Sequence, residues 1–270
     1  MTGAAGMLGR DLVAQLAERH EVTAVDLEVD VTDPDAVRAC VEGCRPEAVF
    51  HLAAFTDVDG AEEREDEAAR VNAGGAANAA RAAAAVGAAL VLPSTDYVFD
   101  GAKGAPYTED DAPAPLGAYG RTKLAGERAA RALCPGTRVA RTAWLYGSAG
   151  RNFVDTMRRL GAERDEVAVV DDQEGSPTWT RELGPALEAL LERPPGVYHA
   201  AGAGSVTWAG LAAAVFEEAG LDCRVRPITT AELGRPAPRP ALSALAVTRP
   251  GAPRLRPWRA ALADYLAETP

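Results

Sequence analysis

The stretch TGAAGMLG, residues 2–9, decides the fold, because Gly3, Gly6 and Gly9 recur at regular spacing beside a helical pattern. Leucines recur every four residues from Leu8 to Leu16 and mark one face of the first helix. A glycine-rich turn lets the backbone approach an anion, and a helix N terminus adds free N–H groups and a favourable dipole. The stretch therefore predicts a phosphate-binding turn.

An acidic residue strengthens this interpretation. Asp26 ends the apolar segment VTAVD, roughly twenty residues beyond the turn. A carboxylate there can bond the ribose hydroxyls of adenosine, so the pair favours a dinucleotide site over a glycine-rich helix start with an exposed Asp. Leu27 and Glu28 supply no cation for a 2′-phosphate, and Asp26 would repel one, which favours NADH over NADPH.

The position of the turn is unusual. Such a turn should follow a buried strand, but only Met1 and Thr2 precede Gly3. Loss of a central strand leaves ladder groups unpaired on both sides, which is unfavourable. We therefore expect a truncated first strand, and a natural chain that includes residues upstream of Met1.

The order of elements predicts an α/β fold of Rossmann type, with a doubly wound parallel sheet. The expected strands of the first half are residues 22–26, 48–54, 89–97 and 138–147, and its later helices are 34–44, 62–86 and 117–133. Further on we expect helices near 153–160, 181–191, 208–219 and 258–268, strands at 166–173 and 196–202, and a loop-rich stretch at 227–257. Residues 1–150 plus about 181–204 would form the dinucleotide-binding domain. A smaller, C-terminal substrate-binding domain would comprise about 151–180 and 205–270.

Composition excludes several classes of protein. The net charge of −11, without a basic stripe, argues against a nucleic-acid partner. No apolar run approaches the ~20 residues of a membrane span, and no signal peptide is recognisable, so we expect a cytoplasmic protein without a membrane partner. The four cysteines and three histidines are scattered, so we expect no metal site built from them.

The chemistry of the chain centres on YGRTK, in which Tyr119 and Lys123 stand one helical turn apart. An ammonium beside a phenol favours phenolate and should lower the pKa of Tyr119 from about 10 towards neutrality. Tyr119 could then act as a general acid, with Thr95 hydrogen-bonding a reacting carbonyl oxygen. The alternative is that Tyr-x-x-x-Lys merely decorates a helix surface.

A series of ordered motifs carries a family resemblance along nearly the whole chain. They are TGAAGMLG, DVTD at 30–33, FTDVDGAE, VNA at 71–73, STDYVFDG, YGRTKLAGE, RTAWLYG, NFVDTM, DDQEGSPT and RPxxSxL at 239–245. With them the chain resembles the extended short-chain dehydrogenase/reductase superfamily and, within it, the dTDP-4-dehydrorhamnose reductases. Each motif alone could arise by chance, whereas their joint order is specific.

The resemblance implies roles for particular residues. Tyr119 matches the proton donor, Lys123 its activating lysine and Thr95 the carbonyl-binding hydroxyl. The cofactor would contact Tyr119 and Lys123 together with Gly3, Gly6, Met7, Leu8, Asp26, Asp30, Val31, Ala53 and Ala54. The substrate would contact Thr56, Val58, Asp96, Tyr97, Trp144, Asn152, Gln173 and Arg239, with Pro177, Thr178 and Ser243 closing over it. For Trp144, packing beside the sheet is an equal alternative. Gly60 and Glu174 depart from the family pattern.

The implied reaction is reduction of the 4-keto group of a dTDP-4-keto-6-deoxyhexose by NADPH or NADH, with dTDP-4-dehydro-L-rhamnose giving dTDP-L-rhamnose. The resemblance also allows a Mg²⁺ requirement and a homodimer. An epimerase or dehydratase of nucleotide sugars is the first alternative, although one acid, Asp96, follows Thr95 where dehydratases have an acidic pair. A non-catalytic regulatory subunit with this fold is the second.

Overall fold

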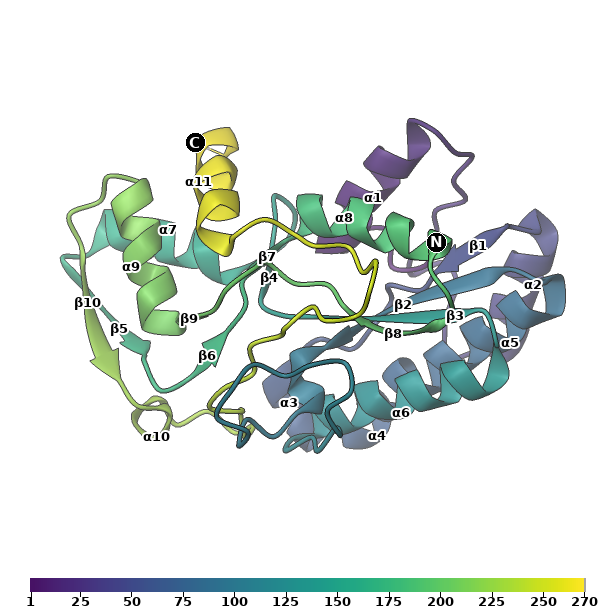
Figure 1. The fold of residues 1–270 in the computed structure, drawn as a ribbon, viewed down its shortest axis with the longest axis horizontal. Helices are drawn as coiled ribbons and strands as arrows, with labels where there is room; N and C mark the ends of the chain where they lie inside the picture. Colours follow the sequence, from purple (N-terminus) through teal and green to yellow (C-terminus); the bar gives the residue numbers. More distant parts are fainter. Residues whose placement is uncertain (270) are drawn as a thin grey trace.

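A parallel sheet organises the N-terminal part of the chain in the computed structural model, which describes residues 1–269 (Figure 1). Its strands are β1 (Ala48–Phe50), β2 (Ala89–Thr95), β3 (Thr137–Thr142) and β8 (Gly196–His199), in the order β1-β2-β3-β8. All neighbouring strands are parallel, so their carboxyl ends meet at one edge of the sheet. The predicted α/β class is confirmed.

Helices cover both faces of this sheet, as expected for a doubly wound fold (Figure 1). On one face lie α1 (Met7–Ala17) and α8 (Thr180–Ala189), which continues into a 3₁₀ turn over Leu190–Glu192. On the other lie α2 (Pro34–Cys44), α5 (Ala76–Val86) and α6 (Ala118–Leu133). The alanines of α5 and Gly126 of α6 permit close packing, since a Cβ at Gly126 would lie 2.3 Å from the Asn72 carbonyl oxygen.

The single helix predicted over 62–86 is wrong, because this region is segmented. It consists of α3 (Val58–Glu63), α4 (Glu65–Ala69), a π-helical turn over Arg70–Gly75, and α5. Arg64 leaves the helical region, with φ −125° and ψ 44°, which separates α3 from α4. In the π turn, the Asn72 side chain bonds both backbone groups of Phe55, so it ties this turn to the segment after β1.

The strand predicted at 22–26 does not form. Residues 21–25 have no regular secondary structure, although the Val25 N–H donates to the Met1 carbonyl at 2.9 Å. At the position of the expected first strand, Thr2 forms an isolated parallel bridge with His51. Gly3, with φ 68°, ends the extended backbone directly after this bridge, and residues 21–25 beside it stay irregular.

A second lobe lies beside the sheet (Figure 1). Its helices are α7 (Phe153–Glu163), α9 (Trp208–Glu218), α10 (Thr230–Leu233) and α11 (Trp258–Glu268), and its strands pair as β5 (Glu166–Val170) with β10 (Arg224–Ile228), β6 (Glu174–Gly175) with β9 (Val206–Thr207), and β4 (Leu145–Tyr146) with β7 (Thr178–Trp179). Its core includes Met157, Val215 and Leu262.

Strand β10 was not predicted, and the strand expected over 138–147 divides into β3 and β4 at Trp144. Tyr146 packs in this second core, whereas Ala252 and Leu255 pack against the sheet, and the division into two domains stays a prediction.

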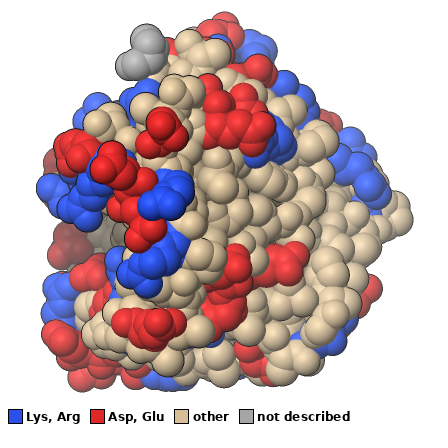
Figure 2. All heavy atoms as spheres, turned by 90° about the vertical axis from the view of Figure 1, so that its left-hand side faces the viewer, with Lys and Arg blue, Asp and Glu red and all other residues tan. Residues whose placement is uncertain are grey.

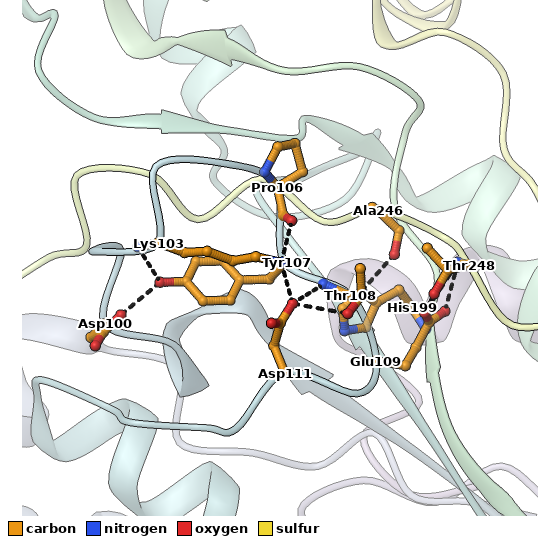
Figure 3. Close-up of polar contacts among 10 residues, drawn as sticks. All are labelled: Asp100, Lys103, Pro106, Tyr107, Thr108, Glu109, Asp111, His199, Ala246 and Thr248. Atoms are coloured by element: carbon orange, nitrogen blue, oxygen red, sulfur yellow. Dashed lines mark hydrogen bonds and ion pairs between the residues drawn. The ribbon is translucent and has the colours of Figure 1, made fainter.

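A polar loop between β2 and α6 fastens the C-terminal segment to the sheet (Figure 3). Tyr107 stacks on Phe99 at 4.2 Å between ring centroids, and its hydroxyl donates to Asp100. The backbone of Tyr107 bonds Ala244 and Ala246 on both sides of a parallel bridge to Leu245. The segment that follows residue 240 is therefore held in register with this loop.

Further contacts extend this attachment (Figure 3). The Glu109 carboxylate accepts hydrogen bonds from the His199 N–H at the end of β8 and from the N–H and hydroxyl of Thr248. The His199 ring, which is fully buried, bonds the Ala246 carbonyl at 2.9 Å. One carboxylate thus joins the loop, the sheet and the C-terminal segment.

Between the sheet and α6, Arg141 on β3 and Glu127 on α6 form a buried ion pair. Arg141 donates from Nε and Nη2 to the two carboxylate oxygens of Glu127, at 3.0 and 2.8 Å. Both side chains are less than 5% exposed. The pair fastens α6, which carries Tyr119 and Lys123, to the centre of the sheet.

The surface is mixed in charge where Figure 2 displays it, with Asp and Glu interspersed among Lys and Arg around an uncharged central area. In the part of the chain that the structure describes, no helix is long and apolar enough to cross a membrane.

Candidate active site

The predicted catalytic side chains meet where β2 ends. Thr95 is the last residue of this strand, and a 3₁₀ turn over Asp96–Val98 follows it. Tyr119 and Lys123 lie in the first half of α6, which packs against that turn. The Tyr119 ring stands edge-on to Tyr97, with 6.0 Å between centroids. The carboxyl end of a parallel sheet is the usual place for a ligand in such folds.

The acidity of Tyr119 differs from the sequence prediction, which expected a lowered value. Burial raises the pKa of Tyr119 to about 12, and the charge of Asp96 adds to the rise, whereas the Thr95 hydroxyl lowers it. The desolvation of a phenolate outweighs the attraction that was expected from Lys123. Without ligands, Tyr119 is therefore a neutral phenol that holds its proton.

A hydrogen bond to β2 fixes the position of the Lys123 ammonium group. Its Nζ donates to the Pro93 carbonyl of β2 at 2.9 Å, which leaves two further N–H donors on the same nitrogen. Burial lowers the pKa of Lys123 to about 8, while the charge of Glu127 acts in the opposite direction. The ammonium form therefore predominates at pH 7, within a site of low polarity.

Asp96 was predicted to contact the substrate, but it is only 2% exposed. One carboxylate oxygen accepts from the Thr95 hydroxyl at 3.0 Å, and the other from the Ser243 hydroxyl at 2.5 Å. The Tyr97 N–H donates to the Thr95 oxygen at 3.1 Å. Both carboxylate oxygens of Asp96 therefore have partners in the chain, and its direct contact with a substrate stays a prediction.

The segment 235–243 closes one side of Tyr119. A cavity of about 10 Å³, lined by Val58, Tyr97, Tyr119, Pro238 and Pro240 among others, has room for about one water molecule. Arg239 fixes this segment, because its Nη2 donates to the Asp59 carboxylate at 2.9 Å. Val58 and Tyr97 therefore line the same cavity as Tyr119, and Arg239 interacts with Tyr97. Contacts of these three residues with a substrate stay predictions.

The glycine turn has the shape that a dinucleotide needs. Gly3 has φ 68°, and a Cβ there would lie 2.6 Å from the Ala53 nitrogen. Gly6 is the N-cap of α1 and has no side chain to occupy the free N–H groups of Met7 and Leu8. Ala53 thus adjoins the turn, and the residues present fit a pyrophosphate.

We expect that Gly9→Ala disrupts this turn. A Cβ at Gly9 would lie 2.2 Å from the Gly3 carbonyl oxygen and 2.7 Å from that of Ala4, both of which are backbone atoms. The overpacking should lower the free energy of unfolding by about 1–3 kcal/mol and weaken binding of NADH. Urea unfolding and NADH fluorescence measure the two effects.

A matched control is Gly43→Ala in α2, where a Cβ meets nothing within 4 Å. Because alanine favours helix over glycine, this variant should be more stable by up to about 1 kcal/mol. Equal unfolding midpoints for the two variants would contradict the predicted role of Gly9.

An open groove of about 390 Å³ continues from the turn and is lined by Ala4, Arg10, Asp26 and Glu28 among others. The Arg10 Nε donates to the Ala5 carbonyl at 3.1 Å. The groove suits the adenosine half of a dinucleotide. The sequence reasoning found no cation here, because Arg10 lies sixteen positions before Asp26 and only the fold brings them together.

Two other predicted cofactor positions have local structural roles. Asp30 accepts hydrogen bonds from the N–H and hydroxyl of Thr32 and turns the chain before α2. Val31 is buried, and its carbonyl accepts from the Asn78 side chain at 3.0 Å. The contacts predicted for Asp30, Val31 and Ala54 with the dinucleotide stay predictions.

Two predicted substrate residues, Asn152 and Gln173, make structural hydrogen bonds. The side chain of Asn152 caps α7 through the Asp155 N–H and donates to the Gly147 carbonyl. Gln173 accepts from the Trp208 indole and donates to Thr230. Their amides take part in these contacts, and their contact with a substrate stays a prediction. Thr56 is exposed just before α3, and its contact with a substrate stays a prediction.

Trp144 lies at the junction of the lobes. Its φ of 48° falls in the left-handed region, and its ring stacks on Trp208 at 3.5 Å between centroids. A Cβ at Gly175 would lie 2.4 Å from the Trp144 ring, so glycine is required there. Packing accounts for Trp144, and contact with the sugar stays a prediction.

The sequence reasoning missed Asp59, which binds Arg239 and Arg235 through its carboxylate. Its position directly before the unusual Gly60 was the available signal. A Cβ at residue 60 would lie 2.1 Å from an Asp57 carboxylate oxygen, so Gly60 accommodates the cap of α3. Over residues 1–269, no three His, Cys, Asp or Glu side chains are grouped so that they could hold a metal ion.

Comparison with known proteins identifies the family. A family model described as the RmlD substrate binding domain matches residues 1–270. The chain belongs to this family. The dTDP-4-dehydrorhamnose reductase of Streptomyces griseus is 48% identical over 277 residues, which cover 98% of this chain and 91% of that protein. The resemblance found in the sequence is therefore confirmed.

Other proteins similar to this RmlD-family chain differ in the sugar that their names give. The probable dTDP-4,6-dihydroxy-2-methyloxan-3-one 4-ketoreductase of Streptomyces antibioticus is 48% identical and covers 98% of this chain and 92% of its own length. The crystal structure of dTDP-4-dehydrorhamnose reductase from Bacillus anthracis in complex with NADP has a TM-score of 0.96 at 39% identity, covering 99% and 97% of the two chains. The two names differ in the sugar, so family membership alone does not specify it.

Proposed function

We propose that this protein reduces the 4-keto group of a dTDP-4-keto-6-deoxyhexose with NADH or NADPH, converting dTDP-4-dehydro-L-rhamnose into dTDP-L-rhamnose. The observation that carries this proposal is the position of Tyr119. Its partly buried, neutral phenol faces Thr95 at the carboxyl end of β2, one helical turn from the Lys123 ammonium. Similarity to dTDP-4-dehydrorhamnose reductases supports the substrate class.

Tyr119, Lys123 and Thr95 have separate roles in this reduction. The nicotinamide, when bound, supplies the hydride that reduces the keto carbon. Tyr119 gives its phenolic proton to the emerging alkoxide, so ketone, hydride and proton yield the alcohol. Lys123, held at Pro93, keeps a positive charge beside the site and has free donors for ribose hydroxyls. Thr95 hydrogen-bonds the reacting oxygen.

The direct experiment is to add dTDP-4-dehydro-L-rhamnose to the protein with NADH or NADPH. Loss of absorbance from the reduced nicotinamide, and dTDP-L-rhamnose identified by NMR, are the expected results. Parallel assays with other dTDP-4-keto-6-deoxyhexoses test the choice of sugar. A product without net oxidation of nicotinamide would favour an epimerase or dehydratase instead.

The two alternative functions are less consistent with the site. A dehydratase needs a free acid and base beside the substrate, whereas both oxygens of Asp96 are occupied by Thr95 and Ser243. A regulatory subunit would bind nicotinamide without turnover. It would not need a buried lysine beside a partly buried tyrosine at the end of β2.

We expect NADH to have the lower KM, because Asp26 and Glu28 lie in the groove that suits adenosine. Arg10, in the same groove, should let NADPH bind as well. One charge at this partly exposed site corresponds to about 1 kcal/mol, or several-fold in KM. Arg10→Ala should therefore raise the ratio of KM for NADPH to KM for NADH several-fold, and Asp26→Asn should lower it. Ratios that stay equal in both variants would refute this electrostatic assignment.

Other expectations attached to this function need their own measurements. Activity after treatment with EDTA, with and without added Mg²⁺, tests a magnesium requirement. Sedimentation equilibrium tests the homodimer, and cell fractionation tests the cytoplasmic location. Titration with labelled DNA tests the expected lack of nucleic-acid binding.

A further inference from the structure

The hydroxyl of Thr95 has one hydrogen, and the structure assigns it a partner. Thr95 donates to Asp96 Oδ1 at 3.0 Å and accepts from the Tyr97 N–H at 3.1 Å. A hydroxyl has one donor and two acceptor positions, so the remaining lone pair is the part that can face Tyr119. While its hydrogen lies on Asp96, Thr95 can accept a hydrogen bond from the site and cannot donate one to a ketone oxygen. The lowering of the Tyr119 pKa by Thr95 needs this hydrogen turned towards Tyr119 instead.

Hydrogen bonds fix the orientation of the Asp96 carboxylate beside Thr95. Its Oδ2 accepts from Ser243 at 2.5 Å, and Ser243 is 1% exposed. The backbone of Ser243 is fixed from the second lobe, because its N–H donates to the Glu174 carbonyl at 2.8 Å. The Tyr107 N–H donates to the next carbonyl, that of Ala244, also at 2.8 Å. A proton on Asp96 would therefore reside on Oδ1, which faces Thr95.

The charged and titratable groups around Asp96 come from three elements. Tyr97 shares its 3₁₀ turn, and Tyr119 comes from α6, with Lys123 one turn further on. Arg239 comes from the C-terminal segment and interacts with the Tyr97 hydroxyl. Burial raises the pKa of Asp96 to about 7, while the hydrogen bonds from Ser243 and Thr95 oppose the rise. Both forms of Asp96 are therefore accessible near neutral pH.

We propose that Asp96 is a positioning residue that sets the direction of the Thr95 hydroxyl. As a carboxylate, Asp96 takes the hydrogen of Thr95. As a neutral acid, Asp96 donates its own hydrogen to Thr95, and Thr95 can then donate to the ketone oxygen. The reactive form of the enzyme is thus the one with Asp96 protonated. This inference rests on the proposed ketone reduction.

Asparagine at position 96 imitates the neutral acid. Its amide N–H can donate to Thr95 while its oxygen accepts from Ser243, and neither changes with pH. The ratio of kcat for Asp96→Asn to kcat for the wild type should rise with pH, by about tenfold per unit above the titration of Asp96. Lys123 titrates in both proteins, so its contribution largely cancels in the ratio. Loss of the Asp96 charge lowers the pKa of Tyr119 from about 12, so the ratio is compared between pH 6 and 9, where the phenol keeps its proton.

Two further variants separate this effect from a structural one. Ser243→Ala removes a hydrogen bond that lowers the pKa of Asp96, so its alkaline loss of kcat should move to higher pH. In a Thr95→Val background, Asp96→Asn should no longer alter the pH profile, because the effect acts through Thr95. A ratio that is independent of pH, or one that persists in the Thr95→Val background, would overturn the proposal.

Infrared difference spectroscopy tests Asp96 without turnover. The carbonyl stretch of a neutral carboxylic acid should appear in the wild type minus Asp96→Asn spectrum at pH 6 and fade as the pH rises. Lack of that band at pH 6 would also overturn the proposal. If the wild type reduces no keto-sugar, the proposed function fails, whereas the infrared titration still decides the state of Asp96.

Discussion

Tyr119→Phe should lower kcat for reduction of the keto-sugar by about a hundredfold or more. A positioned general acid contributes about 10²–10⁴-fold, and phenylalanine keeps the ring but has no proton to give. The edge-on contact with Tyr97 needs only the ring, so folding should be retained. Initial rates of nicotinamide oxidation at saturating substrate measure the loss.

Tyr198→Phe is the matched control. Its hydroxyl donates to the Pro194 carbonyl at 2.6 Å, near the start of β8, on the opposite edge of the sheet from Thr95. Removal of this hydroxyl should leave kcat within a factor of two or so, about the effect of a lost peripheral hydrogen bond. A Tyr119→Phe enzyme that turns over nearly as fast as this control would remove Tyr119 from the mechanism.

Arg141→Ala should destabilise the protein by about 3–5 kcal/mol, because it leaves the carboxylate of Glu127 buried without its partner. Urea unfolding followed by circular dichroism measures the change. The loss should also affect catalysis, because Glu127 lies on α6 one turn beyond Lys123.

Two further variants test whether loss of the buried ion pair causes this destabilisation. Arg159→Ala breaks an exposed pair with Glu163 and should cost less than about 1 kcal/mol. Replacing Arg141 by Met and Glu127 by Leu together removes both buried charges, so most of the stability should return. If Arg141→Ala unfolds at the same urea concentration as Arg159→Ala, the buried pair is not important for stability.

Local signals in the sequence predicted those elements that do not depend on distant partners. Residues 34–44 form a helix as expected, because Asp33 caps it and Pro34 occupies its first turn. Gly87 ends α5 with φ 74° for a similarly local reason. The strand expected at 22–26 depends on a neighbouring strand, and periodicity alone does not reveal whether that neighbour is long enough.

The site was predictable in its residue types and less so in its electrostatics. The spacing of Tyr119 and Lys123 was visible, but the burial that raises the pKa of Tyr119 depends on the whole fold. Motif membership also does not distinguish a ligand contact from a helix cap, as Asn152 illustrates. Ser243 stood in a recognisable motif, but its bond to Asp96 spans 147 positions.

The path of the chain between the lobes affects how the protein folds. In residues 1–269 it leaves the parallel sheet after β3, returns between β7 and α8, leaves again after β8, and returns once more to pack Ala252 and Leu255 before α11. Neither lobe is therefore formed by one continuous segment of the chain. The nucleotide-binding sheet therefore gains its last strand, β8, only after β4 to β7 have been synthesised, and assembly of the two cores is coupled during synthesis as well as in the finished molecule.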